Sequence, residues 1–64
     1  MNIIEELVLA RKELGLSQVQ LAEKVGIVQS HLSKIESGKV SPQLSTLIRL
    51  CNALNKTIVL HIKD

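Results

Sequence analysis

The stretch from Gln18 to Ile35 restricts the fold of this chain more than any other part. It reads QVQLAEKVGIVQSHLSKI, and its apolar residues recur at the three- and four-residue spacing of helices that bury one face. Gly26 stands where the first helix must end, because glycine reaches positive φ without a Cβ clash and can redirect the chain. The pattern predicts two short helices joined by a tight turn, with these residues inside: Leu21, Ala22, Val25, Ile27, Leu32 and Ile35.

The length and the cysteine count limit the number of domains, the cross-links and the cellular location that the chain can have. A chain of 64 residues has room for one domain, and a domain this small often gains stability from oligomerisation. The single cysteine, Cys51, excludes an intrachain disulfide, and no ligand-spaced cysteine pair indicates a zinc site. No apolar run approaches the roughly 18 residues of a membrane span, and the acidic start does not resemble a secretory signal. We therefore expect a cytoplasmic protein without metal, cofactor or membrane contact.

Composition and motifs exclude several functional classes. The net charge of +2 is compatible with nucleic acid but is common among ordinary domains. The chain has no aromatic residue, which argues against proteins that bind single strands by stacking bases on aromatic rings. His31 and His61 lie on different predicted elements, and no local Cys–His or Ser–His pattern joins them to a third group. We therefore expect no enzymatic activity.

Capping patterns mark the starts of two helices. Asn2 and Glu5 have the spacing of a capping box, and so do Ser17 and Gln20. Val28 stands where a Ser or Thr cap would be expected for the third helix, and the sequence offers no account of it. The expected helices run from 3 to 14, from 18 to about 25, from about 29 to 37, and from 43 or 45 to 54, with Gly15, Gly38 and Asn55 as stops.

Apolar stripes on the first and fourth helices indicate which faces should be buried. Val8 and Leu9 fall partly off the first stripe, so they are either exposed or in contact with a partner subunit. The stripe residues are Ile3, Ile4, Leu7, Ala10 and Leu14 on the first helix, and Leu44, Leu47, Ile48, Leu50, Cys51 and Leu54 on the fourth.

The hydrophobic period changes after Asn55. Residues 57–63 alternate, with Ile58, Leu60 and Ile62 on one side, which is the pattern of a β-strand. A lone strand cannot satisfy its own backbone hydrogen bonds, so we expect it to pair with the same strand of a second copy in a homodimer. The alternative is a disordered or helix-extending tail. This divides the chain into a domain over 1–55 and a dimerisation strand over 56–64.

The segment LGLSQVQLAEKVGIVQSHLSKIESGKVSP, followed by LSTLIRLCNAL, resembles the XRE-type helix-turn-helix family of phage Cro and lambda-type repressors. The resemblance covers residues 3–55 and rests on Ser17-Gln18, Leu21-Ala22, Gly26, Ile35–Gly38 and Pro42 together. It implies a mainly α, four-helix lambda-repressor-like fold. It also implies a homodimeric transcriptional regulator, expected to be a repressor, that binds a near-palindromic operator in double-stranded DNA.

The strand after the fourth helix is similar to that of HipB-like antitoxins, whose dimers form a small intersubunit sheet and repress their own operon. This similarity implies a toxin protein as a possible partner. The alternative function is therefore a protein-interaction module that binds a toxin or another partner, with DNA binding secondary.

The third helix is expected to enter the major groove, because only that groove admits a helix and distinguishes every base pair. Gln29 can bond bidentately to adenine, Lys34 can donate to guanine, and Val28 can contact a thymine methyl group. Ser30 and Ser33 are either contacts or solvated helix surface. With Leu32 and Ile35 facing inward, the expected base contacts are Val28, Gln29, Ser30, Ser33 and Lys34.

Other residues are expected to bind phosphate or to brace the third helix. Gln18, at the start of the second helix, is the main candidate for a phosphate contact. By resemblance Arg11 and Glu36 pair to brace the third helix, whereas the alternative is an exposed Arg11 that contacts phosphate. Ser17 is either a contact or only a cap, and His31 is either a contact or helix surface. By resemblance Ser37 and Lys39, which follow the third helix, also contact phosphate. The full set of expected phosphate contacts is Ser17, Gln18, His31, Ser37 and Lys39.

Overall fold

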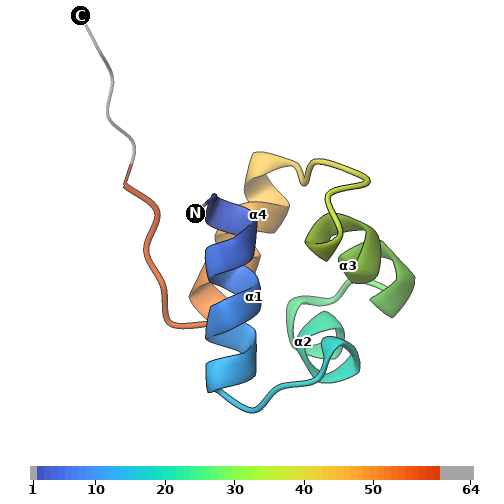
Figure 1. Cartoon of the computed structure of the whole chain (residues 1–64), viewed down its shortest axis with the longest axis horizontal. Coiled ribbons are helices and arrows are strands. Elements are labelled where there is room, and N and C mark those ends of the chain that lie inside the picture. Colours follow the sequence, from blue (N-terminus) through green and yellow to red (C-terminus); the bar gives the residue numbers. More distant parts are fainter. Residues whose placement is uncertain (1, 60–64) are drawn as a thin grey trace, which may run out of the picture.

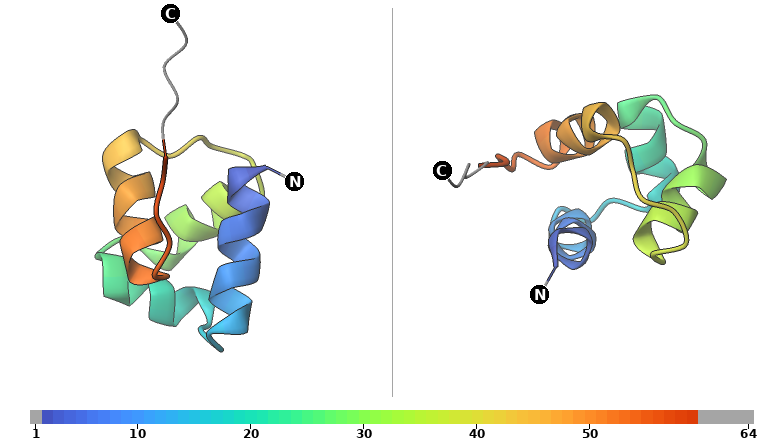
Figure 2. Two further views of the ribbon diagram at one scale, coloured as in Figure 1. Left: turned by 90° about the vertical axis from the view of Figure 1, so that its left-hand side faces the viewer. Right: turned by 90° about the horizontal axis from the view of Figure 1, so that it is seen from above.

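The computed structural model describes residues 2–59, which form four helices (Figure 1). Helix α2 packs against α3 and α4, and α1 packs against α3. Helix α3 lies on the opposite side of the molecule from residues 56–59 (Figures 1 and 2). The mainly α, four-helix architecture that the sequence predicted is confirmed. The helices are α1 (Ile3–Glu13), α2 (Gln18–Val25), α3 (Gln29–Glu36) and α4 (Leu44–Ala53).

The first two helices begin at the predicted caps. The Asn2 side chain accepts a hydrogen bond from the Glu5 N–H, at 2.9 Å. At α2 the box is reciprocal, since the Ser17 hydroxyl accepts from the Gln20 N–H (3.0 Å) and the Gln20 side chain accepts from the Ser17 N–H (2.8 Å). Helix α3 begins after Val28 without a side-chain cap. The first two helix starts therefore follow from local hydrogen bonds that the sequence encodes.

Helices α1, α3 and α4 end in the same way. Each is followed by a residue with positive φ, which is 70° at Gly15, 81° at Gly38 and 58° at Asn55. In each case the next N–H donates to the carbonyl five residues earlier, at 3.1, 2.9 and 2.8 Å respectively. These are Schellman motifs, and they satisfy carbonyls that the end of a helix leaves without partners. The predicted left-handed conformation of Asn55 is confirmed.

Helix α2 ends at Gly26, whose φ is 78°, and α4 contributes to this end. The guanidinium of Arg49 in α4 donates a hydrogen bond to the carbonyl of Val25, the last residue of α2. A cation at the C-terminus of a helix also interacts favourably with the helix dipole. Arg49 therefore links α4 to the turn between α2 and α3.

The core joins α1, α2 and α4 with one residue of α3, Leu32. Of the six apolar residues predicted inside the central pair of helices, five are buried and Ile27 is half-buried. Ile58, from the segment after α4, also packs against this core. The contiguous core cluster consists of Leu7, Ala10, Leu21, Ala22, Val25, Leu32, Leu50, Cys51 and Leu54, and Ile35 of α3 is buried beside it.

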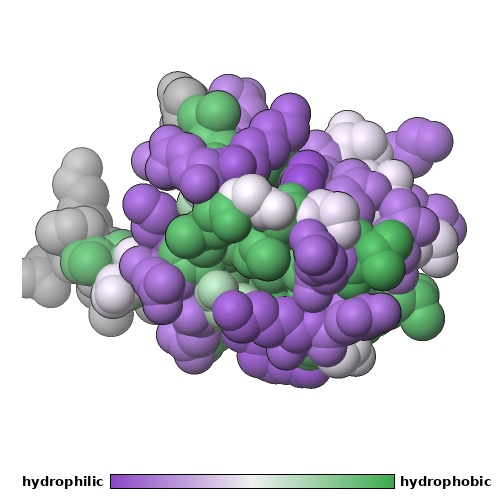
Figure 3. Space-filling view, turned by 90° about the horizontal axis from the view of Figure 1, so that it is seen from below, coloured by the Kyte–Doolittle hydropathy of each residue, from purple (hydrophilic) through white to green (hydrophobic). Residues whose placement is uncertain are grey.

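The apolar stripes predicted on α1 and α4 include residues that the rest of the domain does not cover. Ile3, Leu14, Leu44 and Ile48 were expected inside but are exposed. Ile3 and Leu14 lie at the two ends of α1, beyond the residues that pack on the core, and Leu44 and Ile48 form one edge of α4. In the space-filling view, hydrophobic side chains remain visible in the middle of one face, surrounded by hydrophilic ones (Figure 3).

The predicted C-terminal strand is absent from the described part of its range. Residues 57–59 are not in a strand, and they run back alongside α4 and α1 (Figure 2). The physical reason is that a strand needs a neighbouring strand for its hydrogen bonds, and residues 2–56 provide none. Ile58 is half-buried, whereas Leu60 and Ile62 lie outside the described residues.

Candidate nucleic-acid interface

Helix α3 buries one side completely and exposes the other. Leu32 and Ile35 are each 1% exposed and anchor the helix, whereas Val28 at its start is 68% exposed. Gln29 and Lys34 lie on the exposed side, so neither is packed inside the domain. The 3.6-residue period separates the two sides. Of the residues expected to contact bases, Val28, Gln29, Ser30 and Lys34 are exposed and Ser33 is half-buried.

The start of α3 is held by α2 through two glutamines. The side-chain amide of Gln29 donates from Nε2 to Oε1 of Gln18, at 2.8 Å. Gln18 in turn donates from its own Nε2 to Oε1 of Glu36, at 3.1 Å. Both glutamines are the first residues of their helices, and the packing of α2 against α3 brings their side chains into contact. A chain of hydrogen bonds therefore connects the first and last residues of α3.

The end of α3 is held by α1 through an ion pair. Arg11 Nε donates to Glu36 Oε2 at 2.8 Å, and Arg11 Nη2 donates to Glu36 Oε1 at 2.9 Å. The third nitrogen, Nη1, donates to the carbonyl of Leu16 at 2.8 Å. The two side chains are only 10% and 11% exposed. This bidentate geometry is the strong form of a charge-assisted pair, and Arg11 is buried rather than an exposed phosphate contact.

The charges around α3 favour a negatively charged ligand. Between Lys24 and Lys39 the sequence contains one carboxylate, Glu36, and Arg11 neutralises it. The remaining formal charges of that segment are positive, and Lys24, Lys34 and Lys39 are all exposed. Positive charge beside an exposed helix attracts the phosphates of a nucleic acid.

The residues expected to bind phosphate lie at the start of α2, on α3 and just after α3. Ser17 caps α2, and its hydroxyl is already an acceptor for the Gln20 N–H. The Ser37 hydroxyl donates to the carbonyl of Lys34 at 3.2 Å, so it closes the end of its own helix. Gln18 is half-buried in the hydrogen-bond chain, whereas His31 and Lys39 are exposed.

Sequence reasoning missed two sets of contacts at this site. It placed Gln18 at the start of α2 but did not foresee its bonds to Gln29 and Glu36. No local pattern gives this contact, because Gln18 lies at the end of α2 that is far from the turn and meets Gln29 only through the packing of α2 against α3. Arg49 was also missed, and no local pattern identifies it, because its partner is the carbonyl of Val25 on another helix.

Within residues 2–59, reactive or metal-ligating side chains do not cluster away from this site. Cys51 is buried on α4, and burial raises the pKa of its thiol, which favours the unreactive neutral form. His31 is exposed on α3, away from the core that holds Cys51. Among residues 2–59 no three His, Cys, Asp or Glu side chains form a cluster that could hold a metal ion. No helix in that range is both long enough and apolar enough to cross a membrane.

Comparison with known proteins identifies relatives across most of the chain. A family model described as helix-turn-helix matches residues 7–60. An uncharacterised HTH-type transcriptional regulator of Haemophilus influenzae is 43% identical over 56 residues, which are 88% of this chain. The immunity repressor protein of Bacillus phage phi105 is 43% identical over 54 residues, 84% of the chain. Antitoxin HigA1 of Mycobacterium tuberculosis is 36% identical over 62 residues, 97% of the chain.

These relatives are longer than the region they share with this chain. The matches cover 57% of the Haemophilus protein, 38% of the phage repressor and 42% of the antitoxin. No solved structure matches the chain at a significant level. The similarity therefore concerns the four-helix unit that carries α3.

Proposed function

Because this chain belongs to the helix-turn-helix family, we propose that it is a transcriptional regulator that binds specific sequences of double-stranded DNA. The observation that carries the proposal is the position of α3, whose apolar side anchors it in the domain and whose polar side is exposed. A helix presented in this way fits the major groove, where each base pair displays a distinct pattern of donors and acceptors. The relatives named as regulators and as a repressor support repression as the mode of action.

The exposed side of α3 supplies the base contacts in this proposal. Gln29 offers donors and an acceptor to adenine, Lys34 donates to guanine, and Val28 contacts a thymine methyl group. Ser30 and Ser33 lie between them on the same helix. Phosphate contacts from Ser17, Gln18, His31, Ser37 and Lys39 then fix the register of the helix in the groove.

Replacing Gln29 by alanine is expected to weaken binding to the preferred sequence by about 1–3 kcal/mol and to relax the preference at one position of each half-site. Replacing Lys39 by alanine is expected to weaken binding to all sequences alike and to lower the salt dependence by about one phosphate contact. Titration of each variant with selected and random duplexes, at several salt concentrations, separates the two effects. Equal losses on both duplexes for Gln29→Ala would remove Gln29 from the base-reading residues.

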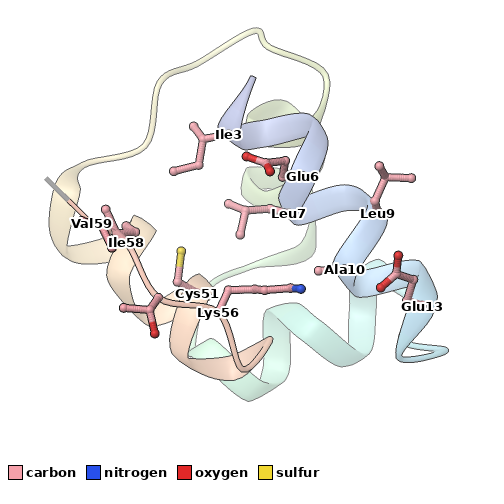
Figure 4. A pocket seen from close by; sticks show the side chains of 11 residues that line it. Ile3, Glu6, Leu7, Leu9, Ala10, Glu13, Cys51, Lys56, Ile58 and Val59 are labelled. Carbon is pink, nitrogen blue, oxygen red and sulfur yellow. The ribbon is translucent and has the colours of Figure 1, made fainter. Parts of the chain in front are cut away.

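The homodimer is the second part of the proposal, and a groove lined by both apolar and charged side chains supports it. Side chains from α1, from Cys51 and from residues 56–59 surround a groove of about 430 Å³ (Figure 4). Leu9 and Val59 at this groove are 45% and 69% exposed. Exposed apolar side chains beside charged ones, such as Glu6 and Lys56, are typical of a protein interface.

The position of this groove suits a dimer that binds DNA. Residues 56–59 lie on the side of the molecule opposite to α3, so a second copy that pairs there leaves both α3 helices uncovered (Figures 1 and 2). We propose that the segment over 56–64, including Ile58, Leu60 and Ile62, forms a strand only when it pairs with the same segment of a second copy. Two α3 helices about 34 Å apart would then bind a near-palindromic operator.

Removal of residues 56–64 is expected to convert the dimer into a monomer, because it deletes the pairing segment while the four helices remain. Sedimentation equilibrium of the full and shortened chains at equal concentrations measures this change. Far-UV circular dichroism verifies that the shortened chain is still helical, since the loss of Ile58 also removes a contact with the core. A shortened chain that stays helical and dimeric would show that the dimer interface lies elsewhere.

The similarity to an antitoxin supports a second candidate function, the binding of a partner protein. In this case a toxin would cover part of the surface of the dimer that faces away from DNA. The neighbouring reading frame and co-purification with the tagged chain from its native host test the idea. A single co-purifying protein encoded next to this chain would support it.

A further inference from the structure

The peptide group between Val25 and Gly26, where α2 ends, is held on both sides. Its N–H, on Gly26, donates to the carbonyl of Ala22 at 2.9 Å. Its carbonyl, on Val25, accepts from the guanidinium of Arg49 in α4. Among residues 2–59 no backbone N–H donates to this carbonyl, because the next N–H, on Ile27, also bonds to Ala22. Arg49 therefore supplies a donor that the backbone at the end of α2 lacks.

Gly26 has no intrinsic preference that would keep this peptide group in place. Its φ is 78°, and glycine adopts positive and negative φ about equally. Rotation of the peptide group could therefore move Gly26 to negative φ and send the chain in another direction. The bond from Arg49 opposes that rotation, because the carbonyl of Val25, a residue only 6% exposed, would lose its partner.

The missing side chain at Gly26 is also what lets the guanidinium approach the turn. A Cβ atom on Gly26 would lie 2.9 Å from Nη2 of Arg49, which is too close for two atoms that are not bonded. Helix α4 packs against α2, and this packing brings Arg49 to the end of α2. The glycine and the arginine therefore fit each other at the turn.

The turn at Gly26 determines where α3 begins. Only Ile27 and Val28 separate Gly26 from Gln29, the first residue of α3. Helix α3 also starts without a side-chain cap, so no cap of its own fixes its first turn. A recognition site must be held within about 0.5 Å of its productive geometry. A rotation at Gly26 would therefore displace Val28 and Gln29, both of which are proposed to contact bases.

We infer that Arg49 is a positioning residue for DNA recognition, which sets the direction in which α3 leaves α2 by holding the peptide group between Val25 and Gly26. The inference rests on the proposed function, because the residues that Arg49 positions are those proposed to contact bases. Arg49 itself touches no DNA in this arrangement. It acts from α4 on the backbone that leads into α3.

Replacing Arg49 by methionine tests the inference, because methionine keeps an aliphatic stem but has no donor. The ratio of the affinities for selected and random duplexes should fall by roughly five- to twenty-fold, a part of what good base contacts contribute. Arg49→Lys keeps a cation with donors and should recover part of this ratio. Arg49 is exposed, so both variants should fold, and thermal melting verifies that they do.

The salt dependence of binding separates positioning from a direct phosphate contact. The loss of one phosphate contact lowers the slope of log affinity against log salt by about 0.9. Lys12→Met is the matched control, since it removes the same charge from an exposed residue of α1. Arg49→Met should show the same slope as Lys12→Met, and only Arg49→Met should change the ratio of the two affinities.

Amide hydrogen exchange measures the turn without DNA. In Arg49→Met the N–H groups of Gly26 and Ile27 should exchange several-fold faster than in the wild-type chain, because the peptide group between Val25 and Gly26 is then held on one side only. The N–H of Leu54, which donates to the carbonyl of Leu50 at 3.1 Å, should keep its wild-type rate. This contrast distinguishes a local change at the turn from a loss of overall stability.

The outcomes distinguish this inference from the proposed function. An unchanged affinity ratio in Arg49→Met would overturn the inference, and so would equal losses on both duplexes with a lower salt slope. In either case DNA recognition by α3 still stands. If the wild-type chain selects no sequence from a random pool, the proposed function fails and the inference fails with it. Faster exchange at Gly26 in Arg49→Met would then show that Arg49 serves the fold alone.

Discussion

Replacement of Arg11 by methionine is expected to lower the free energy of unfolding by about 3–5 kcal/mol. The substitution leaves the Glu36 carboxylate, which is 11% exposed, without its cation, and it removes the donor to the Leu16 carbonyl. A domain of 64 residues is stable by only roughly 3–10 kcal/mol, so at least about a third of the stability would be lost. Urea denaturation followed by circular dichroism measures the change.

Two further variants show whether the cost comes from the unpaired charge. Lys12→Met changes the next residue, which is exposed, and should alter stability by no more than about 0.5 kcal/mol. The double variant Arg11→Met/Glu36→Leu removes both charges and should recover most of the loss, because a buried pair is often replaceable by apolar side chains of similar size. A loss below about 1 kcal/mol for Arg11→Met alone would contradict a bracing role for the pair.

Replacement of Leu32 by alanine is expected to cost about 2–5 kcal/mol of unfolding free energy. Leu32 is 1% exposed and is the residue of α3 that enters the core shared with α1, α2 and α4. Its removal leaves a cavity beneath α3, and a close-packed interior collapses only partly around such a cavity. The same denaturation experiment gives the value, and binding to the selected duplex should weaken as the folded fraction falls.

The matched control for this prediction lies on the same helix. Val28→Ala removes apolar atoms from a side chain that is 68% exposed, and it should change stability by only a few tenths of a kcal/mol. Its effect should instead appear in the preference for thymine at the contacted position. If Val28→Ala and Leu32→Ala destabilise the domain equally, the division of α3 into a buried and an exposed side is wrong.

Helix ends were predictable from the sequence because their causes are local. The box formed by Ser17 and Gln20 and the positive φ of Gly38 and Asn55 each depend on a few neighbouring residues. The inward positions of Leu21, Leu32 and Ile35 follow from the 3.6-residue period and need no knowledge of neighbouring helices. These features place the exposed side of α3, which is the basis of the candidate site.

Other features were not predictable because they depend on how separate elements meet. The exposure of Leu44 and Ile48 reflects which edge of α4 the rest of the chain covers, and helical spacing does not determine that. The bond from Arg49 to the Val25 carbonyl depends on the approach of α4 to α2. The strand predicted over 57–63 needs a neighbouring strand for its hydrogen bonds, and residues 2–56 provide none, so alternation alone was insufficient.

The hydrogen bonds of the candidate site were only partly predictable from the sequence. The pairing of Arg11 with Glu36 came from the family resemblance and not from spacing, since 25 residues separate them. The hydrogen bonds from Gln29 to Gln18 and from Gln18 to Glu36 need α2 to pack against α3 in one particular way. Sequence reasoning identified these three residues but not the hydrogen bonds between them.

Helix α3 is attached near both of its ends, at Gln29 through Gln18 and at Glu36 through Arg11. Within residues 2–59, the side chains of Ser30, His31, Ser33 and Lys34 make no hydrogen bond or ion pair with the rest of the domain. Substitutions at these four positions therefore change the donors, acceptors and charges that α3 exposes, without breaking the contacts that hold α3 in the domain. In the proposed function, a few surface replacements at these positions would therefore change the DNA sequence that is preferred, while the four-helix fold stays unchanged.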